Sequence, residues 1–341
     1  MMNRVCFISV YFGEIPNKMH LFLKSCKWNP KFDWLLVSDH EIPFNDISSN
    51  VKSIKLSQEN FRERLSSVSG IEIPKFLPYK VCDFRPAFGD IFKYELEGYE
   101  FWGISDMDMI LGNLSDFITD DLLNNFDKIY TFGHLSLIRN TAELNTIYKL
   151  DTPNSRNFKQ VFQNPLSCVY DEYEGFTEKI VDCNYRVYCN KECADIYKTK
   201  NRIKICDINR FKLIQYRNNY SNYCEKKNYK YQLFTIDRGR IIKYFLDDNS
   251  LKKREYAYIH KLEYENEYDL NKNSRYVITV DGLIKCDDFF NLVDNESYQL
   301  KYFIEYNNPR LLYENFKFLC LYVRLKIRRL RKAFLPRRDE I

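Results

Sequence analysis

Short apolar runs rich in strand-forming residues alternate with segments of helical periodicity over the first hundred residues. "VCFISVYFG" and "FDWLLVSDH" are two such runs, and apolar residues recur at helical spacing over residues 15–29 between them. A third run, "VKSIKLS", precedes "QENFRERLSSV", which has the pattern of a helix. Buried strands that alternate with helices are typical of a mostly parallel sheet with helices on both faces. We therefore expect an α/β fold.

Composition sets the class of protein. The 341 residues suffice for one large domain with an appendage or for two ordinary domains, and the 16% aromatic content supplies a large apolar area despite 29% charged residues. No run approaches the ~18 apolar residues that cross a bilayer. The eleven cysteines include no C-x-x-C pair, and "MMNRVCFISVYFG" reads as a core strand and not as a secretion signal. We expect a globular cytoplasmic protein.

Two carboxylates follow an apolar run in "FWGISDMDMILGN". Asp106 and Asp108 stand just beyond the expected strand, and ligands bind at the carboxyl ends of strands in open parallel sheets. Neighbouring anions are costly to hold together unless they share a cation. Their oxygen atoms suit manganese or magnesium, and such ions bind diphosphate and stabilise a departing phosphate. The pair predicts a metal site, and the alternative is a chance D-x-D in a loop.

The segment "YKVCDFRPAFGDIFKYELEGYE" precedes this strand. Its spacing predicts a helix that Asp83 caps, with Pro86 in the first turn and Gly98 at the end. Such a helix would place Lys80, Asp83 and Arg85 in one neighbourhood ahead of the acidic pair. An arginine there can stabilise a developing diphosphate. The alternative is an internal salt bridge plus a cap.

The motifs "SVYFGEIPNKMHLFLKSCKWNPKFDWLLVSD", "KVCDFRPAFGDIF", "FWGISDMDMILGNL", "FGHLSLIRN" and "YIH" occur in this order. Their combination resembles a family of bacterial polysaccharide-biosynthesis proteins regarded as nucleotide-sugar glycosyltransferases of the GT-A fold. The resemblance covers approximately residues 3–262. More distantly, an Asp-x-Arg ahead of the D-x-D strand is similar to the sugar-transferring domains of large clostridial toxins and of fungal initiating mannosyltransferases.

This resemblance implies a domain organisation. A Rossmann-like GT-A domain would cover residues 1–262, with a nucleotide-sugar half at about 1–150 and an acceptor half at about 151–262. Residues 263–341 would form a C-terminal extension with a helical appendage.

The resemblance also assigns the metal ligands. Asp106 and Asp108 would bind Mn²⁺ or Mg²⁺, with Asp106 shared between the metal and the ribose or sugar of the donor. His260 in "YAYIHKLEY" matches a late histidine that completes the metal or diphosphate site, and imidazole can ligate manganese or hydrogen-bond a phosphate oxygen. The alternative for a lone histidine is a structural role.

A further set of residues would bind the nucleotide sugar; these are Tyr11, Phe12, Asp39, Lys80, Asp83 and Arg85. An aromatic face at the end of the first strand can stack on uracil, and Asp39 can hydrogen-bond the base or the ribose. The resemblance places the Asp and Arg of the 83–85 segment against the transferred sugar and the phosphate. The alternative is that Tyr11 and Phe12 are core residues and that Asp39 is a cap or turn residue.

Candidate catalytic residues come from two later segments. "GHLSLIRN" presents His134 and Arg139 after a strand, where donor and acceptor sugars would meet. "YDEYEGF" offers Asp171 and Glu172, and with less support Glu174, from a loop of the kind that supplies a general base. The alternative for these carboxylates is simple solvation.

The end of the chain is basic and amphipathic. Residues 307–338 carry apolar side chains at three- and four-residue steps among many Arg and Lys. Such a helix lies well on an anionic membrane surface, and a lipid-linked acceptor would make that position useful. The alternatives are packing on the catalytic domain and nucleic-acid binding; we expect no nucleic-acid partner because no recognised module accompanies the tail. We expect a peripheral protein on the inner face of the cell membrane.

These features predict a metal-dependent, hexosyltransferase-like enzyme. It would move a sugar from a nucleotide-diphosphate sugar, expected to be a UDP-sugar, to a saccharide acceptor in capsule or O-antigen biosynthesis. One alternative is a sugar nucleotidyltransferase, which favours a glycine-rich basic loop after the first strand, and "YFGEIPNK" is not one. Another is a non-catalytic, membrane-associated scaffold.

Overall fold

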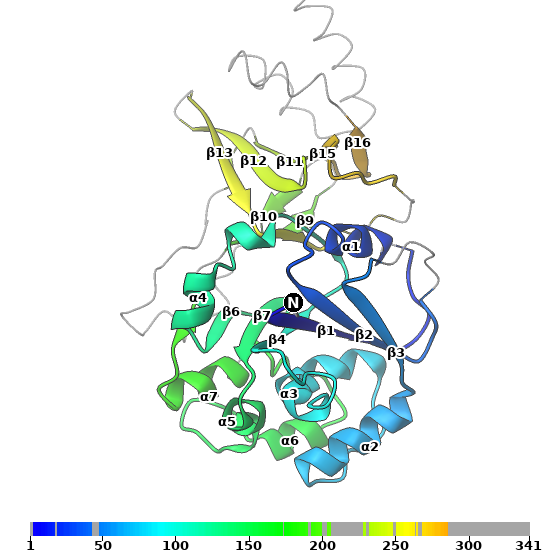
Figure 1. Cartoon of the computed structure of the whole chain (residues 1–341), viewed down its shortest axis with the longest axis vertical. Helices are drawn as coiled ribbons and strands as arrows, with labels where there is room; N and C mark the ends of the chain where they lie inside the picture. Colours follow the sequence, from blue (N-terminus) through cyan, green and yellow to red (C-terminus); the bar gives the residue numbers. More distant parts are fainter. Residues whose placement is uncertain are drawn as a thin grey trace, which may run out of the picture.

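The computed structural model describes residues 3–285, apart from 18, 43–47, 173, 190–191, 200–202, 206–227, 230–231, 248–249, 263 and 265–267. The described strands form three sheets of seven, four and five strands (Figure 1). The expected helical appendage and basic helix belong to residues 286–341 and lie outside the described residues.

The seven-stranded sheet is mostly parallel, which confirms the expected α/β class. In sheet order its strands are β3 (Val51–Lys55), β2 (Asp33–Ser38), β1 (Val5–Tyr11), β4 (Phe101–Ser105), β7 (Leu135–Arg139), β6 (Lys128–Phe132) and β8 (Val187–Tyr188). Strands β1 to β4 run parallel, and β7 is antiparallel to both of its neighbours, β4 and β6. The strand order reverses between β1 and β4, and in open α/β sheets such a switch point is where ligands bind.

Helices cover both faces of this sheet because successive strand residues point to opposite sides. Cys6 and Ile8 of β1 face one core, and Val5 and Phe7 face the other. The first core is covered by α2 (Gln58–Ser69), η1 (Pro78–Ala87), α3 (Phe88–Ile91), α5 (Ala142–Thr146), η3 (Ile147–Lys149), α6 (Phe158–Gln163) and α7 (Phe176–Asp182). The second is covered by α1 (Met19–Cys26), η2 (Leu114–Asp116) and α4 (Asp120–Asn125).

Two smaller sheets pack beside the large one. The four-stranded sheet contains, in order, β10 (Ile203–Ile205), β9 (Cys193–Lys198), β14 (Tyr258–His260) and β5 (Met109–Leu111). The antiparallel five-stranded sheet contains β13 (Ser250–Tyr256), β12 (Arg240–Asp247), β11 (Gln232–Asp237), β15 (Arg275–Ile278) and β16 (Leu283–Lys285). A third apolar core joins these two sheets.

The structure does not divide the chain at residue 262, where we expected a domain to end. Strand β15 pairs with β11, so residues 275–285 complete the sheet that begins at residue 232. Apolar side chains from both sides of residue 262, among them Phe234 and Ile278, share one core. Strand pairing and a shared core therefore link the residues before and after the expected boundary.

The predicted helix after Asp83 is largely wrong. A 3₁₀ helix, η1, runs through Pro86, and only the four residues of α3 follow it as α-helix. Pro86 lacks the N–H that an α-helix interior needs, which favours the tighter form. The α-helix ends at Ile91, before the predicted end at Gly98, although Gly98 has the left-handed φ of +86° that favours glycine.

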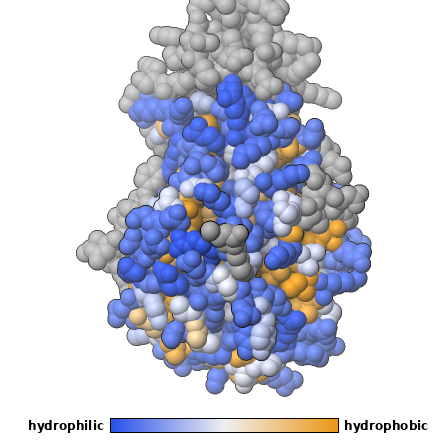
Figure 2. Space-filling model, viewed as in Figure 1, coloured by the Kyte–Doolittle hydropathy of each residue, from blue (hydrophilic) through white to orange (hydrophobic). Residues whose placement is uncertain are grey.

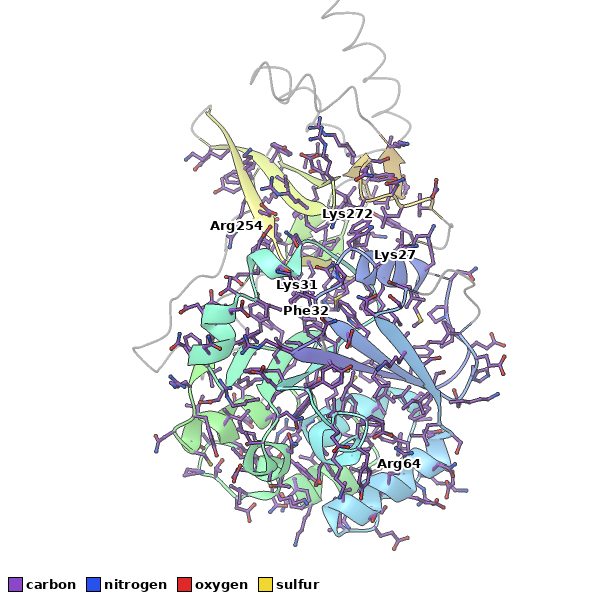
Figure 3. The ribbon with its side chains drawn as sticks, viewed as in Figure 1. Lys27, Lys31, Phe32, Arg64, Arg254 and Lys272 are labelled. Carbon is purple, nitrogen blue, oxygen red and sulfur yellow. The ribbon has the colours of Figure 1, made fainter. Side chains whose placement is uncertain are left out.

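Charged side chains occupy much of the described surface, including the edge of the large sheet. The face shown in Figure 2 is mostly hydrophilic over the described residues. The edge strand β3 exposes Lys52 and Lys55, and such lysines discourage pairing with another chain. Arg64 of α2, labelled in Figure 3, forms an ion pair with Glu95 at 2.8 Å.

Among the described helices, none has both the length and the apolar character to cross a bilayer.

Gly103 in β4 has no room for a side chain between its neighbours in the central sheet. A Cβ there would lie 2.6 Å from side-chain atoms of both Phe7 and Leu137. We predict that Gly103→Ala lowers the free energy of unfolding by about 1–3 kcal/mol, because the packed neighbours must shift. Urea denaturation measures the change. The control Ser53→Ala, on exposed β3, should stay within about 0.5 kcal/mol of the parent. Equal stability of Gly103→Ala and the parent would contradict the packing argument.

Candidate functional site

A cleft of about 810 Å³ opens at the carboxyl ends of β1 and β4, where the strand order reverses. Its lining includes most of the predicted site residues: Tyr11, Phe12, Arg85, Asp106, Asp108, His134, Asp171, Glu172 and His260. The lining also includes Asp195, which sequence reasoning missed. Three predicted residues, Asp39, Lys80 and Asp83, do not line the cleft.

The acidic pair lies on the turn that connects two sheets. Strand β4 of the large sheet ends at Ser105, and β5 of the four-stranded sheet begins at Met109. The N–H of Asp106 donates to the carbonyl oxygen of His134 at 2.9 Å, which fixes the start of the turn. The side chains of Asp106 and Asp108 are 24% and 27% exposed. Both carboxylates are therefore held at the cleft by short, buried strands on either side.

Strand pairing brings His260 to this turn from 150 residues away. His260 ends β14 and stands opposite Met109 in the antiparallel pairing of β14 with β5. Its Nε2 lies 3.3 Å from Asp108 Oδ1 and 3.6 Å from Asp106 Oδ2. One ligand atom from each of these three residues lies within 4.8 Å of the others. Two carboxylates and an imidazole nitrogen are a donor set that fits Mn²⁺.

Without a metal, a proton on His260 compensates the acidic pair. Burial lowers the pKa of His260, but hydrogen bonds to Asp106, Asp108 and Asp195 outweigh burial and raise the pKa to about 12. The carboxylates thus favour a cation at Nε2.

Arg85 spans the cleft between two carboxylates. Its Nη1 donates to Asp171 Oδ2 at 2.7 Å and to the carbonyl oxygen of Gly133 at 3.1 Å, and its Nη2 donates to Asp106. Burial opposes ionisation of Asp106, but the Arg85 and His260 cations outweigh it and hold the pKa of this carboxyl well below its usual range. Asp106 is therefore ionised at neutral pH.

Asp171 and Glu172 lie on the opposite side of Arg85. Burial raises the pKa of Asp171 to about 7, with Arg85 opposing the rise and Glu172 adding to it. Glu172 accepts a hydrogen bond from the N–H of Gly133 at 2.8 Å, and burial raises its pKa as well. A Cβ at position 133 would lie 2.2 Å from Asp171 Oδ2, so only glycine permits this approach. Both carboxylates belong to residues that line the cleft.

His134 is buried behind the metal-ligand candidates. Its ring stacks on that of His260 with centroids 4.3 Å apart, and its Nδ1 hydrogen-bonds the Tyr258 hydroxyl at 2.7 Å. Strand β7 begins just after His134 and ends at Arg139, which pairs with Asp127 and lies 4.7 Å over the Phe101 ring. Arg139 does not line the cleft where we expected it to meet the sugars.

The end of β1, where we expected the nucleotide base to bind, belongs partly to the protein core. Tyr11 is half-buried at the cleft, whereas Phe12 is buried and packs edge-on against Phe61 at 5.5 Å. Asp39 accepts a hydrogen bond from the N–H of Gly13 at 2.8 Å and pairs with His40 at 2.9 Å. These contacts fit the alternative that Asp39 is a turn residue.

Lys80 and Asp83 form the internal salt bridge that the sequence left open, and neither side chain lines the cleft where we expected donor contacts. Lys80 Nζ lies 2.8 Å from Asp83 Oδ2 and also donates to the carbonyl oxygens of Val161 and Leu166. The carboxylate of Asp83 accepts hydrogen bonds from backbone N–H groups of residues 168 and 170 and is not a helix cap. Both side chains are almost fully buried, at 1% and 0% exposure. This pair joins η1 to the loop that leads to Asp171.

Lys80→Met should destabilise the fold strongly. Removing one partner leaves the charge of Asp83 buried without a cation, which costs about 3–5 kcal/mol. Chemical denaturation measures the loss. Arg64→Met is the matched control, because the Arg64–Glu95 pair is partly exposed and should contribute no more than about 1 kcal/mol. Similar small losses for the two variants would contradict the structural role of the buried pair.

Comparison with known proteins places the chain in a family without giving a function. No curated protein matches the sequence significantly. One family profile covers residues 7–287, which include every residue of the site described above. The chain therefore belongs to the Family of unknown function (DUF6625).

Proposed function

We propose that this protein is a metal-dependent glycosyltransferase of the GT-A type that uses a nucleotide-diphosphate sugar, specifically a UDP-sugar, as donor. The observation that carries the proposal is the convergence of Asp106, Asp108 and His260 Nε2 at the switch point of a mostly parallel sheet. A diphosphate needs cations, and this cleft supplies Arg85 beside a place for a divalent ion.

Each side of the cleft has a part in the proposed reaction. Bound Mn²⁺ or Mg²⁺ would stabilise the negative charge that develops on the departing diphosphate. Arg85 keeps Asp106 ionised and presents a fixed cation in a largely buried setting, where charge stabilisation is strong. Tyr11 offers an aromatic face to the base at the end of β1. Asp171, with a pKa of about 7, is poised to accept a proton from the acceptor hydroxyl.

The acceptor in this proposal is a saccharide used in cell-surface polysaccharide assembly. Residues 166–172 supply Ser167, Val169, Asp171 and Glu172 to the cleft wall, so the acceptor would enter on that side. We also propose that the acceptor is lipid-linked and is met at the inner face of the membrane, because the basic segment 307–338 is suited to an anionic membrane surface. This segment lies outside the described residues.

The direct test is metal-dependent hydrolysis of donor sugars. A panel of UDP-, GDP- and CDP-sugars incubated with the protein and Mn²⁺ should yield one released sugar and its nucleotide diphosphate, and chelation by EDTA should stop the release. Asp108→Asn should lower the rate about 100-fold or more, because it removes a charged metal ligand. Chromatography of the nucleotide products measures both effects.

The control Asp116→Asn changes an exposed acid a few residues further along and should leave the rate unchanged. If no nucleotide binds in the presence of Mn²⁺, the glycosyltransferase proposal fails.

A second prediction concerns pH. The raised pKa of Asp171 leaves it protonated below about 7, so kcat/KM for sugar transfer should fall about tenfold per pH unit below that value and level off above it. Asp171→Asn should remove this limb of the profile together with most of the transfer rate. Initial rates from pH 5.5 to 8.5 test it, with Mn²⁺ binding checked at each pH. An unchanged acidic limb in Asp171→Asn would exclude Asp171 as the base.

A further inference from the structure

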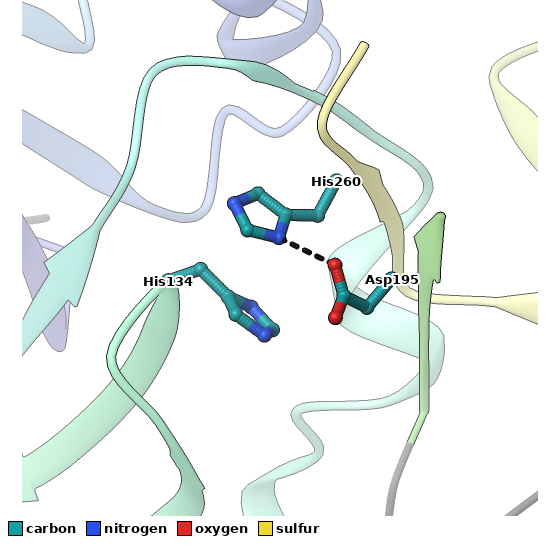
Figure 4. A group of neighbouring side chains, drawn as sticks. All are labelled: His134, Asp195 and His260. Atoms are coloured by element: carbon teal, nitrogen blue, oxygen red, sulfur yellow. Dashed lines mark hydrogen bonds and ion pairs between the residues drawn. The ribbon is translucent and has the colours of Figure 1, made fainter. Parts of the chain in front are cut away.

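Three adjacent strands bring a third carboxylate to His260. In the four-stranded sheet β14 lies between β9 and β5. Its His260 stands opposite Asp195 in the parallel pairing with β9 and opposite Met109 in the antiparallel pairing with β5. Paired residues of neighbouring strands point to the same face, so Asp195 and His260 lie side by side (Figure 4). Their neighbours Ala194 and Ile259 point into the core on the other face.

The imidazole of His260 therefore lies between Asp195 on one side and the acidic pair on the other. Its Nδ1 donates to Asp195 Oδ1 at 3.0 Å, and its Nε2 faces the acidic pair, 3.3 Å from Asp108. A neutral imidazole carries its proton on one nitrogen only. The hydrogen bond from Nδ1 to Asp195 leaves the lone pair of that neutral form on Nε2, where a metal ligand is needed.

Asp195 is suited to this task because other contacts fix it. Its side chain is only 9% exposed, and its Oδ1 lies 3.1 Å from Lys261 Nζ as well. The ring that it orients is held on its flat side by the ring of His134. Because Oδ1 already accepts from His260, a direct metal bond from this atom would require breaking that hydrogen bond.

We propose that Asp195 is the positioning residue of the metal site: it fixes the orientation and the neutral tautomer of His260 so that Nε2 binds the divalent ion. This inference rests on the proposed function for the identity of the ion. In this role Asp195 acts on the ion through His260 and contacts neither the donor nor the acceptor. Asp195, His260 and the ion would form a carboxylate–histidine–metal arrangement.

Mn²⁺ binding to the full-length protein, without donor, tests the inference by electron paramagnetic resonance titration. Asp195→Ala should raise the Kd for Mn²⁺ about 10- to 100-fold, and Asp195→Asn, which keeps an acceptor oxygen but loses the charge, should raise it by a smaller factor of about three to ten. Donor hydrolysis by Asp195→Ala should return to near the parental kcat at saturating Mn²⁺, because the residue acts only through the metal.

Asp237→Ala is the matched control. Asp237 is also largely buried and ion-paired, with Arg275 at 2.8 Å, but it belongs to the five-stranded sheet and does not line the cleft. Its loss should leave the Kd for Mn²⁺ unchanged.

A Kd for Asp195→Ala within twofold of the parent would overturn the inference, and so would hydrolysis that saturating Mn²⁺ does not restore. If Asp195→Ala fails to fold, Asp195→Asn decides, and a Kd within twofold of the parent overturns the inference. Failure of the proposed function looks different: the parent would then bind Mn²⁺ but release no sugar from any nucleotide sugar.

Discussion

The compensation of clustered carboxylates by a few cations is the interaction on which this cleft depends. Asp106, Asp108, Asp171, Glu172 and Asp195 all line one cleft. Bringing so many carboxyl groups together in a partly buried place is costly unless charge is neutralised or protons are taken up. Arg85 and His260 supply the positive charge, and burial raises the pKa of both Asp171 and Glu172. The proposed divalent ion would add positive charge at the same place.

The fold makes this concentration of charge possible by building the cleft from separate rigid pieces. Asp106 follows a central strand of the large sheet, and Arg85 belongs to η1. In the four-stranded sheet, His260 is the last residue of β14 and Asp195 lies within β9. The buried Lys80–Asp83 pair ties η1 to the loop that carries Asp171. The charged groups of the cleft thus come from four separate parts of the chain.

Sequence reasoning found the residues that follow strong local patterns. Asp106 and Asp108 stand directly after the apolar run of β4, so their position at a sheet edge could be predicted from the chain alone. The α/β class followed from alternating strands and helices in the same way. The resemblance supplied His260 and the 171–172 pair, and the structure places all of them around one cleft.

The residues whose positions could not be predicted from the sequence share a different physical cause. Asp195 has no motif around it, and its place beside His260 depends on the pairing of two strands 65 residues apart. Lys80 and Asp83 have the residue types of a binding site, but backbone groups more than 80 residues away satisfy them inside the protein. Long-range pairing decides whether a charged residue faces a ligand or the core, and local sequence does not record it.

The position of bound manganese tests the central claim most directly. Crystals soaked with Mn²⁺ and UDP, measured near the manganese absorption edge, would show the ion by anomalous scattering. The account predicts one strong peak within about 2.5 Å of Asp108 and of His260 Nε2, with diphosphate oxygens completing its coordination. A peak elsewhere, or no peak at a Mn²⁺ concentration that supports turnover, would contradict it.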